Sequence, residues 1–300
     1  MAQPFDARKL ELAGEPVPVA DSVRIAGRYA TAAVSANGVL VYRATSVVNS
    51  RQLTWFDRSG KALSPVAEPG AYTEVALSPD GKRAATARFD PSSNFDLWVT
   101  ELGKNLSTKF TFDKAEDRNP VWSPDGSRIV FSSAREGSRN LYWKLSNGAT
   151  TEEILFKSSE DKTPLDWSRD GRYLLYSVND PKTKLDLWYM PMAEGERKPV
   201  RFLATEFFEA QGRFSPDGRF VAYMSNENGV LDVYVRSFPD PTGKWQVSKG
   251  GGTEPRWRRD GKELFYISGN RVMAVDISDS PAFHSGPPKA LFETRGGFRL

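Results

Sequence analysis

Trp122-Ser123-Pro124-Asp125-Gly126 is the stretch of sequence that decides the fold. It ends one apolar segment and leads into an alternating run over 127–132, which is typical of two strands joined by a tight turn. Pro124 pre-sets φ at the second position of a type I turn, and Asp125 tolerates the third position. Gly126 supplies the positive φ that closes the hairpin, and Ser123 can bond the turn backbone.

Five further copies of this stretch follow the same pattern. They are Val34-Ser35-Ala36-Asn37-Gly38, which is the weakest, Leu77-Ser78-Pro79-Asp80-Gly81, Trp167-Ser168-Arg169-Asp170-Gly171, Phe214-Ser215-Pro216-Asp217-Gly218 and Trp257-Arg258-Arg259-Asp260-Gly261. Their glycines are 43 to 47 residues apart, and each interval holds four strand-like segments. A period of this length with four strands per unit is typical of a β-propeller blade.

The predicted fold class is therefore all-β. The repeats predict a propeller of six full four-stranded blades over residues 28–294, within a single domain over 1–300. Residues 1–22 add an N-terminal half-blade, because their sequence is similar to the outer half of the last unit over 273–291. The chain is on this interpretation a piece of a longer polypeptide. Two alternatives are a seven-bladed ring and an N-terminal strand that completes the last blade.

Composition excludes several classes of function. Lys plus Arg number 41 and Asp plus Glu 38, a net charge of +3 that does not favour nucleic acid or an anionic membrane as partner. The chain has no cysteine, so a disulfide framework and thiolate metal sites are excluded. No apolar run is long enough to span a membrane, and the polar first residues do not resemble a signal peptide.

No pattern in the chain indicates catalysis. The lone histidine, His284, lies in a Pro- and Gly-rich segment without a Gly-x-Ser-x-Gly elbow. Phosphate-binding loops and calcium loops are also missing from the sequence. We therefore expect no catalytic residue, no metal and no cofactor.

A ring of polar residues at one repeat position is the predicted binding site. Four positions before the motif Ser or Arg lie Glu74, Asn119, Gln211 and Glu254, with Asp117 and Arg118 beside them. Equivalent positions of successive blades converge on the central channel, so we expect these side chains to face one opening together. Carboxylates with an interspersed arginine favour a protein, a peptide or a cationic or zwitterionic small ligand over nucleic acid. The alternative is that these groups only bind water.

The Ser-Pro-Asp-Gly hairpins resemble the repeats of the TolB propeller of the Tol-Pal system. The sequence outside these hairpins resembles more closely the C-terminal propellers of bacterial transmembrane serine/threonine protein kinases. The residues that carry this likeness include 5–10 (Phe-Asp-Ala-Arg-Lys-Leu), 55–61 (Trp-Phe-Asp-Arg-Ser-Gly-Lys) and 117–122 (Asp-Arg-Asn-Pro-Val-Trp). The resemblance implies a periplasmic sensor or interaction region tethered to a kinase domain. None of the kinase motifs occurs in the 300 residues.

The predicted function is thus a non-catalytic binding or sensing module, as part of a receptor-type kinase. One alternative is the non-catalytic propeller of a prolyl-oligopeptidase-type serine peptidase, where similar hairpins occur. A hydrolase or lyase that works at the channel mouth is a third class, which no motif supports.

Overall fold

The structure is a computed structural model, and it describes residues 5–6, 9, 11–12, 14–15, 25–26, 29–30, 32–34, 40–42, 50–90, 94–193, 197–279 and 282–294. The chain divides into two compact units, Met1–Ser50 and Arg51–Leu300. In both units the described regular elements are β-strands. The single-domain interpretation of residues 1–300 stays a prediction.

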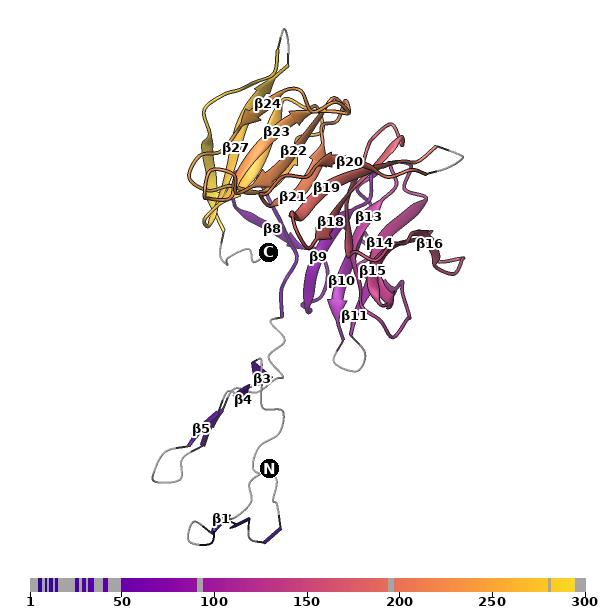
Figure 1. Ribbon diagram of the computed structural model, residues 1–300, viewed down its shortest axis with the longest axis vertical. Coiled ribbons are helices and arrows are strands. Elements are labelled where there is room, and N and C mark those ends of the chain that lie inside the picture. Colours follow the sequence, from indigo (N-terminus) through magenta and orange to yellow (C-terminus); the bar gives the residue numbers. More distant parts are fainter. Residues whose placement is uncertain are drawn as a thin grey trace. The chain divides into compact units, whose positions relative to one another are not determined.

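Five antiparallel blades follow one another in the second unit, in sequence order from purple through magenta and orange to yellow (Figure 1). The first is β9 (Tyr72–Leu77), β10 (Arg83–Phe89), β11 (Phe95–Glu101) and β12 (Leu106–Lys109); the second is β13 (Asp117–Trp122), β14 (Arg128–Glu136), β15 (Ser138–Leu145) and β16 (Glu153–Phe156). The third is β17 (Lys162–Trp167), β18 (Tyr173–Asp180), β19 (Lys184–Pro191) and β20 (Val200–Leu203); the fourth is β21 (Glu209–Phe214), β22 (Phe220–Ser225), β23 (Asp232–Ser237) and β24 (Lys244–Gln246). The fifth is β25 (Thr253–Trp257), β26 (Glu263–Ser268), β27 (Arg271–Ser278) and β29 (Lys289–Glu293), with β28 (His284–Ser285) also paired to β27.

The prediction of six full blades plus a half-blade is wrong, and so is its seven-bladed alternative. In the first repeat, β5 (Ala32–Val34) pairs with β6 (Leu40–Tyr42), and β7 (Thr54–Phe56) pairs with β8 (Ala62–Pro65), as two separate two-stranded sheets. The remaining N-terminal strands also form two-stranded sheets, β1 (Phe5–Asp6) with β2 (Glu11–Leu12) and β3 (Ile25–Ala26) with β4 (Tyr29–Ala30). Turn residues 35–39 of the first repeat lie outside the described residues.

The sequence of the first repeat offers a physical reason for the missing blade. Its turn replaces the proline of the motif by Ala36 and the aspartate by Asn37. The third and fifth blades form with an arginine at the proline position, so the lost aspartate sets the first repeat apart: its sequence lacks the carboxylate that accepts from a turn amide in the other five. Its position before the motif serine carries Val34, which brings much less apolar area than a tryptophan.

The hairpin β7–β8 contacts both the last and the first blade of the second unit. Arg58 forms an ion pair with the buried Glu263 of β26, and the ring of Phe56 stacks on Phe292 of β29. At the other end, the Arg51 guanidinium donates to the carbonyl of Tyr72 over 3.2 Å. This two-stranded sheet thus lies between the fifth blade and the first.

The repeated turns are held together by serine and aspartate side chains. In the second blade the Ser123 hydroxyl donates to Asp125 over 2.5 Å and accepts from the Arg128 amide over 2.9 Å, while the Ser127 amide donates to Asp125 over 2.9 Å. Hydroxyls at the equivalent serines of three other blades make the same two bonds. The five turn glycines have φ between 71° and 78°, which confirms the predicted left-handed position.

The positive φ of these glycines predicts the effect of a substitution. Gly126→Ala places a Cβ in open space, its nearest neighbour being Pro79 at 3.7 Å, so only the backbone conformation opposes the change. We expect the free energy of unfolding to fall by about 1 kcal/mol. Gly103, which has no positive φ and an equally open Cβ site, is the matched control, and chemical denaturation of both variants is the measurement. Equal losses in the two variants would contradict this explanation of the turn.

The turn carboxylates predict a destabilisation by acid. The Ser123 hydroxyl and the Ser127 amide hold the pKa of Asp125 below its ordinary value, and Arg258 with the Lys262 amide lowers the pKa of Asp260 to about 2. A depressed folded pKa stabilises the fold above the unfolded value of about 4, and that contribution is lost as the pH falls through the folded pKa. In urea unfolding, the wild type should therefore exceed Asp260→Asn in stability at pH 6, and the difference should vanish between about pH 4 and 2. A difference that is independent of pH would refute the assignment.

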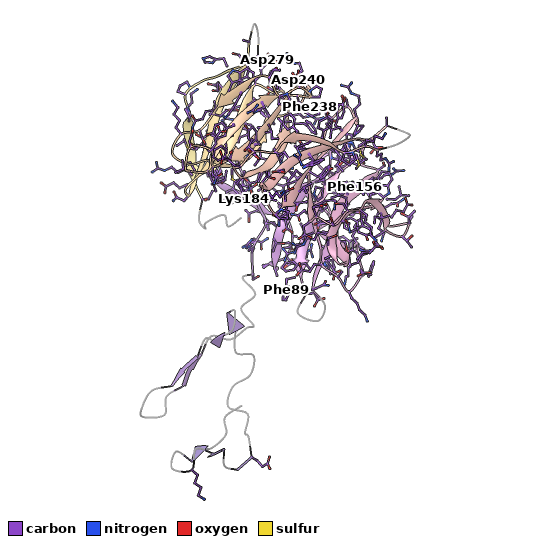
Figure 2. All side chains as sticks on the ribbon, in the orientation of Figure 1. Phe89, Phe156, Lys184, Phe238, Asp240 and Asp279 are labelled. Carbon is purple, nitrogen blue, oxygen red and sulfur yellow. The ribbon has the colours of Figure 1, made fainter. Side chains whose placement is uncertain are left out.

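The apolar core lies between neighbouring blades. Trp122 and Phe131 of the second blade pack with Ala85 and Leu97 of the first. Phe214 of the fourth blade meets Phe238 at 4.9 Å in an edge-to-face contact, within a cluster that also takes residues from the third blade. Figure 2 shows side chains filling the space between the ribbons. Each blade therefore depends on its neighbours to bury its faces.

The hairpin β1–β2 should be less protected against hydrogen exchange than the sheet of the second blade. Its strands share two residue pairs, whereas β14 is paired along both of its edges. Amides in a sheet with so few bonds open with little cost in free energy. Hydrogen exchange should therefore be faster at residues 5–12 than at 129–132. Equal protection of the two segments would show that β1–β2 has a closing role.

Candidate functional site

The predicted binding residues lie in the inner strands of the blades. Inner strands contact one another in succession, from β9 through β13, β17 and β21 to β25, so they line the side of the unit that faces the propeller axis. Glu74, Asn119 and Gln211 are each the third residue of an inner strand, and Glu254 is the second residue of β25. The strands themselves, rather than the loops between blades, carry these side chains.

Three of these residues share an unusual backbone conformation. Asn119, Gln211 and Glu254 have φ of 56°, 56° and 54°, the left-handed region that favours glycine. The ladder to the second strand shifts register around each of them, as in a β-bulge. Such a conformation costs about 1–3 kcal/mol at a non-glycine residue and is concentrated at functional sites. The same strained feature thus recurs in three blades at the predicted position.

The structure brings the predicted residues together in two pairs. The side-chain amide of Gln211 donates to the Glu254 carboxylate over 2.7 Å, and the backbone amide of Glu254 donates back to the side-chain Oε1 of Gln211 over 2.7 Å. Arg118 approaches Glu74 at 3.4 Å. Asn119 accepts from the hydroxyl of Ser132 over 3.2 Å within its own blade. Convergence of all four ring residues on one opening stays a prediction.

Asp117 takes part in a buried ion pair. Its carboxylate is fully buried and accepts from Arg135 over 3.0 Å. Burial raises the pKa of Asp117, while the Ser133 hydroxyl and Arg135 oppose this shift. Arg118 remains partly exposed and stacks over Phe95 at 3.4 Å from the ring centroid. Of these two neighbours in sequence, Arg118 is the one that a ligand can reach.

Sequence reasoning missed a second set of charged residues in the inner strands. Asp166, Arg213 and Arg256 each directly precede the motif aromatic in three successive blades. The first two blades carry Ala76 and Val121 at this position, so the change from apolar to charged was visible in the repeat alignment. Arg256 donates to the Glu254 carboxylate over 2.9 Å, and the charges of Asp166, Arg256 and Glu254 all act on Arg213.

Arg213 is the cation of this set that lacks a partner. Its Nε is buried without an acceptor, and the guanidinium has no hydrogen bond or ion pair with any described residue. Burial, together with the charge of the nearby Arg256, lowers the pKa of Arg213 to about 10. Asp166 and Glu254 oppose this shift through their charges, although Asp166 makes no hydrogen bond to Arg213 and accepts instead from the amides of Phe214 and Trp167.

A shallow depression lies at the other end of the inner strands. The turns of the second and third blades enclose about 540 Å³ there, and Pro124, Arg128, Trp167 and Arg169 are among the lining residues. Trp167 donates its indole N–H to the carbonyl of Gly171, so this side chain is already engaged within its own turn. The depression follows from the spacing of the repeated turns.

Within the described ranges, no group of three or more His, Asp or Glu side chains is arranged to hold a metal ion. No helix in the part of the chain that the structure describes has the length and apolar character needed to cross a membrane.

Comparison with known proteins shows which propellers this chain resembles. The model of the TolB beta propeller domain (PD40) matches residues 57–198. An uncharacterized peptidase of Bacillus subtilis, YuxL, is 27% identical over 210 residues, which is 61% of this chain and 30% of that protein. The Tol-Pal system protein TolB of Helicobacter pylori strain 26695 is 23% identical over 163 residues, 54% of this chain and 36% of that protein.

This chain spans about a third of the length of these curated relatives. Among solved structures, the putative TolB of Agrobacterium tumefaciens aligns with a TM-score of 0.64 at 19% identity, over 78% of this chain and 84% of that one. The sequence match and the structural match agree on the architecture: the blades of this chain are similar to those of TolB β-propellers.

Proposed function

We propose that this propeller is a non-catalytic module that binds a protein or peptide along its inner strands. The observation that carries the proposal is the strained left-handed conformation shared by Asn119, Gln211 and Glu254. Glycine would adopt this conformation without cost, and yet these three blades carry a polar side chain there. Retention of strain at one repeated position favours a role in recognition over a role in folding.

The charges of the ring define the ligand class that we propose. Glu74 and Glu254 supply two carboxylates on the inner strands, and Arg118 supplies a cation beside Glu74. A peptide backbone offers both donors and acceptors to such a surface, whereas the phosphates of nucleic acid would require a basic one. A zwitterionic or cationic small molecule is the other ligand that fits.

The proposed setting is extracytoplasmic, in a sensor region of a receptor-type serine/threonine kinase. The likeness of residues 5–10, 55–61 and 117–122 to kinase-linked propellers supports it, as does the similarity to proteins of the Tol-Pal system. A second candidate is the propeller of a serine peptidase, and the similarity to the peptidase YuxL favours it. In both settings the chemistry would belong to another domain of the parent protein.

Binding can be tested without a known partner. A phage-displayed library of random peptides is panned against the wild-type chain, and the selected peptides are synthesised for fluorescence polarisation. The variant with Glu74, Asn119, Gln211 and Glu254 all replaced by alanine should bind at least about tenfold more weakly, since each replacement removes a polar contact. Leu106→Ala/Phe112→Ala is the control, because both side chains are more than half exposed at the outer edge of the first blade. Unchanged affinity in the ring variant would refute the proposal.

The two settings are separated by the coding sequence on either side of these 300 residues. A kinase domain with one membrane helix supports the sensor setting, and an α/β-hydrolase domain supports the peptidase setting. A reading frame with neither would remove both settings and leave only the binding role.

A further inference from the structure

The backbone around Arg213 is fixed from both sides. Gln211, two residues earlier, adopts the left-handed conformation of the bulge, with φ of 56°. The indole of Trp257 in the next blade donates to the carbonyl of Arg213 over 3.1 Å. The guanidinium therefore starts from a rigid strand between two blades, which is the kind of support that a preorganised binding group requires.

All other polar groups of this cluster already have partners. Asp166 accepts from the amides of Phe214 and Trp167, over 2.8 Å and 3.0 Å. Gln211 and Glu254 bond to each other twice, and Arg256 donates to Glu254 and to the Pro255 carbonyl. Among the described residues, Arg213 is the side chain of this cluster for which no hydrogen bond is found, and its Nε–H is buried.

An unused, partly buried guanidinium is unfavourable for the fold. Its Nε–H has left water without gaining an acceptor, and the charge of Arg256 lies near enough to lower the pKa of Arg213. A bound anion would remove both penalties. The Nε–H and one Nη–H of a guanidinium present a parallel pair of donors that matches the two oxygens of a carboxylate.

We propose that Arg213 anchors a carboxylate of the bound peptide, either its C-terminus or an acidic side chain. The inference rests on the proposed function, because it names the group by which a peptide at the ring is held. A carboxylate is favoured over a phosphate, since Asp166 and Glu254 lie nearby and would repel a dianion more strongly than a monoanion. With Glu74 and Glu254 on the inner strands, the cluster would thus recognise a ligand that carries both signs of charge.

The test uses a matched pair of small probes on the intact chain. N-acetylglycine carries a carboxylate, and N-acetylglycinamide is the same molecule with the charge removed. In a ¹H–¹⁵N spectrum of arginine Nε–H groups, the Arg213 resonance, assigned by its loss in Arg213→Met, should move downfield with N-acetylglycine and stay in place with the amide. Sodium sulfate at equal ionic strength distinguishes carboxylate recognition from a general response to anions.

Thermal unfolding gives a second readout. N-acetylglycine should raise the midpoint of the wild type and of Arg259→Met, a matched variant at an exposed turn arginine, and leave that of Arg213→Met unchanged. If N-acetylglycine does not shift the Arg213 resonance, or if sulfate shifts it equally, the proposal of a carboxylate anchor is overturned.

The outcomes separate this inference from the proposed function. In one outcome, library peptides bind through the ring residues while the carboxylate probe leaves the Arg213 resonance unchanged. That outcome supports the peptide-binding function and refutes the carboxylate anchor. If Arg213 answers N-acetylglycine specifically but no library peptide binds through the ring, the carboxylate site stands and the peptide as its ligand is overturned.

Discussion

Trp122→Ala is expected to lower the free energy of unfolding by about 3–5 kcal/mol. The indole is 6% exposed, and it packs among residues of the first and second blades. Its Nε1–H donates to the carbonyl of Ala76 over 2.9 Å, and the guanidinium of Arg83 lies 4.6 Å from the ring centroid. Removal of this side chain therefore opens a cavity and breaks a hydrogen bond between two blades.

Urea unfolding of purified variants measures this effect, and Leu77→Ala supplies the control. Leu77 occupies the same repeat position in the first blade but is 46% exposed, so its truncation should cost much less than that of Trp122. Trp167, which is only partly buried, should give an intermediate value. Equal losses at positions 77 and 122 would show that burial between blades does not determine the contribution of this position.

Arg135→Met is expected to cost about 3–5 kcal/mol, because it leaves a buried carboxylate without its partner. Asp117 is fully buried, and the Arg135 guanidinium donates to both of its oxygens, over 3.0 Å and 3.2 Å. The same guanidinium lies 4.5 Å from the ring centroid of Tyr142. Lys104→Met, which breaks an exposed pair with Glu101, is the control and should cost much less, because solvent screens this pair.

The pH dependence of the Arg135→Met deficit identifies its cause. Burial already raises the pKa of Asp117, and loss of the neighbouring cation should raise this pKa further. A folded pKa above the unfolded one penalises the fold at high pH, and the penalty is lifted as the pH falls below the folded pKa. The difference in stability between wild type and variant should therefore shrink on acidification, and Asp117→Asn/Arg135→Met should recover part of it at pH 7. A deficit that does not change with pH would mean that lost packing causes it.

Local interactions explain which parts of the fold could be predicted from the sequence. The serine, aspartate and glycine of each turn bond within five residues of one another, so the motif alone predicted the hairpins and the positive φ of Gly126. The number of blades could not be predicted in this way. Whether a repeat joins its two hairpins into one sheet depends on packing against neighbouring blades, and the first repeat keeps the strand pattern but not the turn residues.

The candidate site, too, could be predicted from the sequence only in part. The repeat predicted the positions of the ring residues. In the structure, Gln211 contacts Glu254 and Arg118 contacts Glu74. The left-handed conformation of Asn119, Gln211 and Glu254 was not visible, because none of them is a glycine. The unpaired state of Arg213 depends on where the partners of Asp166 and Glu254 lie, which only the folded chain reveals.

Hydrogen exchange with and without a selected peptide tests the central claim, binding along the inner strands, most directly. Saturating peptide should slow exchange in the inner strands β13, β21 and β25, which carry Asn119, Gln211 and Glu254, because a ligand there restrains the bulged backbone. The outer strands β12, β16 and β24 should be unaffected. Protection confined to these outer strands or to the turns around Gly126 and Gly171, with no change in the inner strands, would contradict the account.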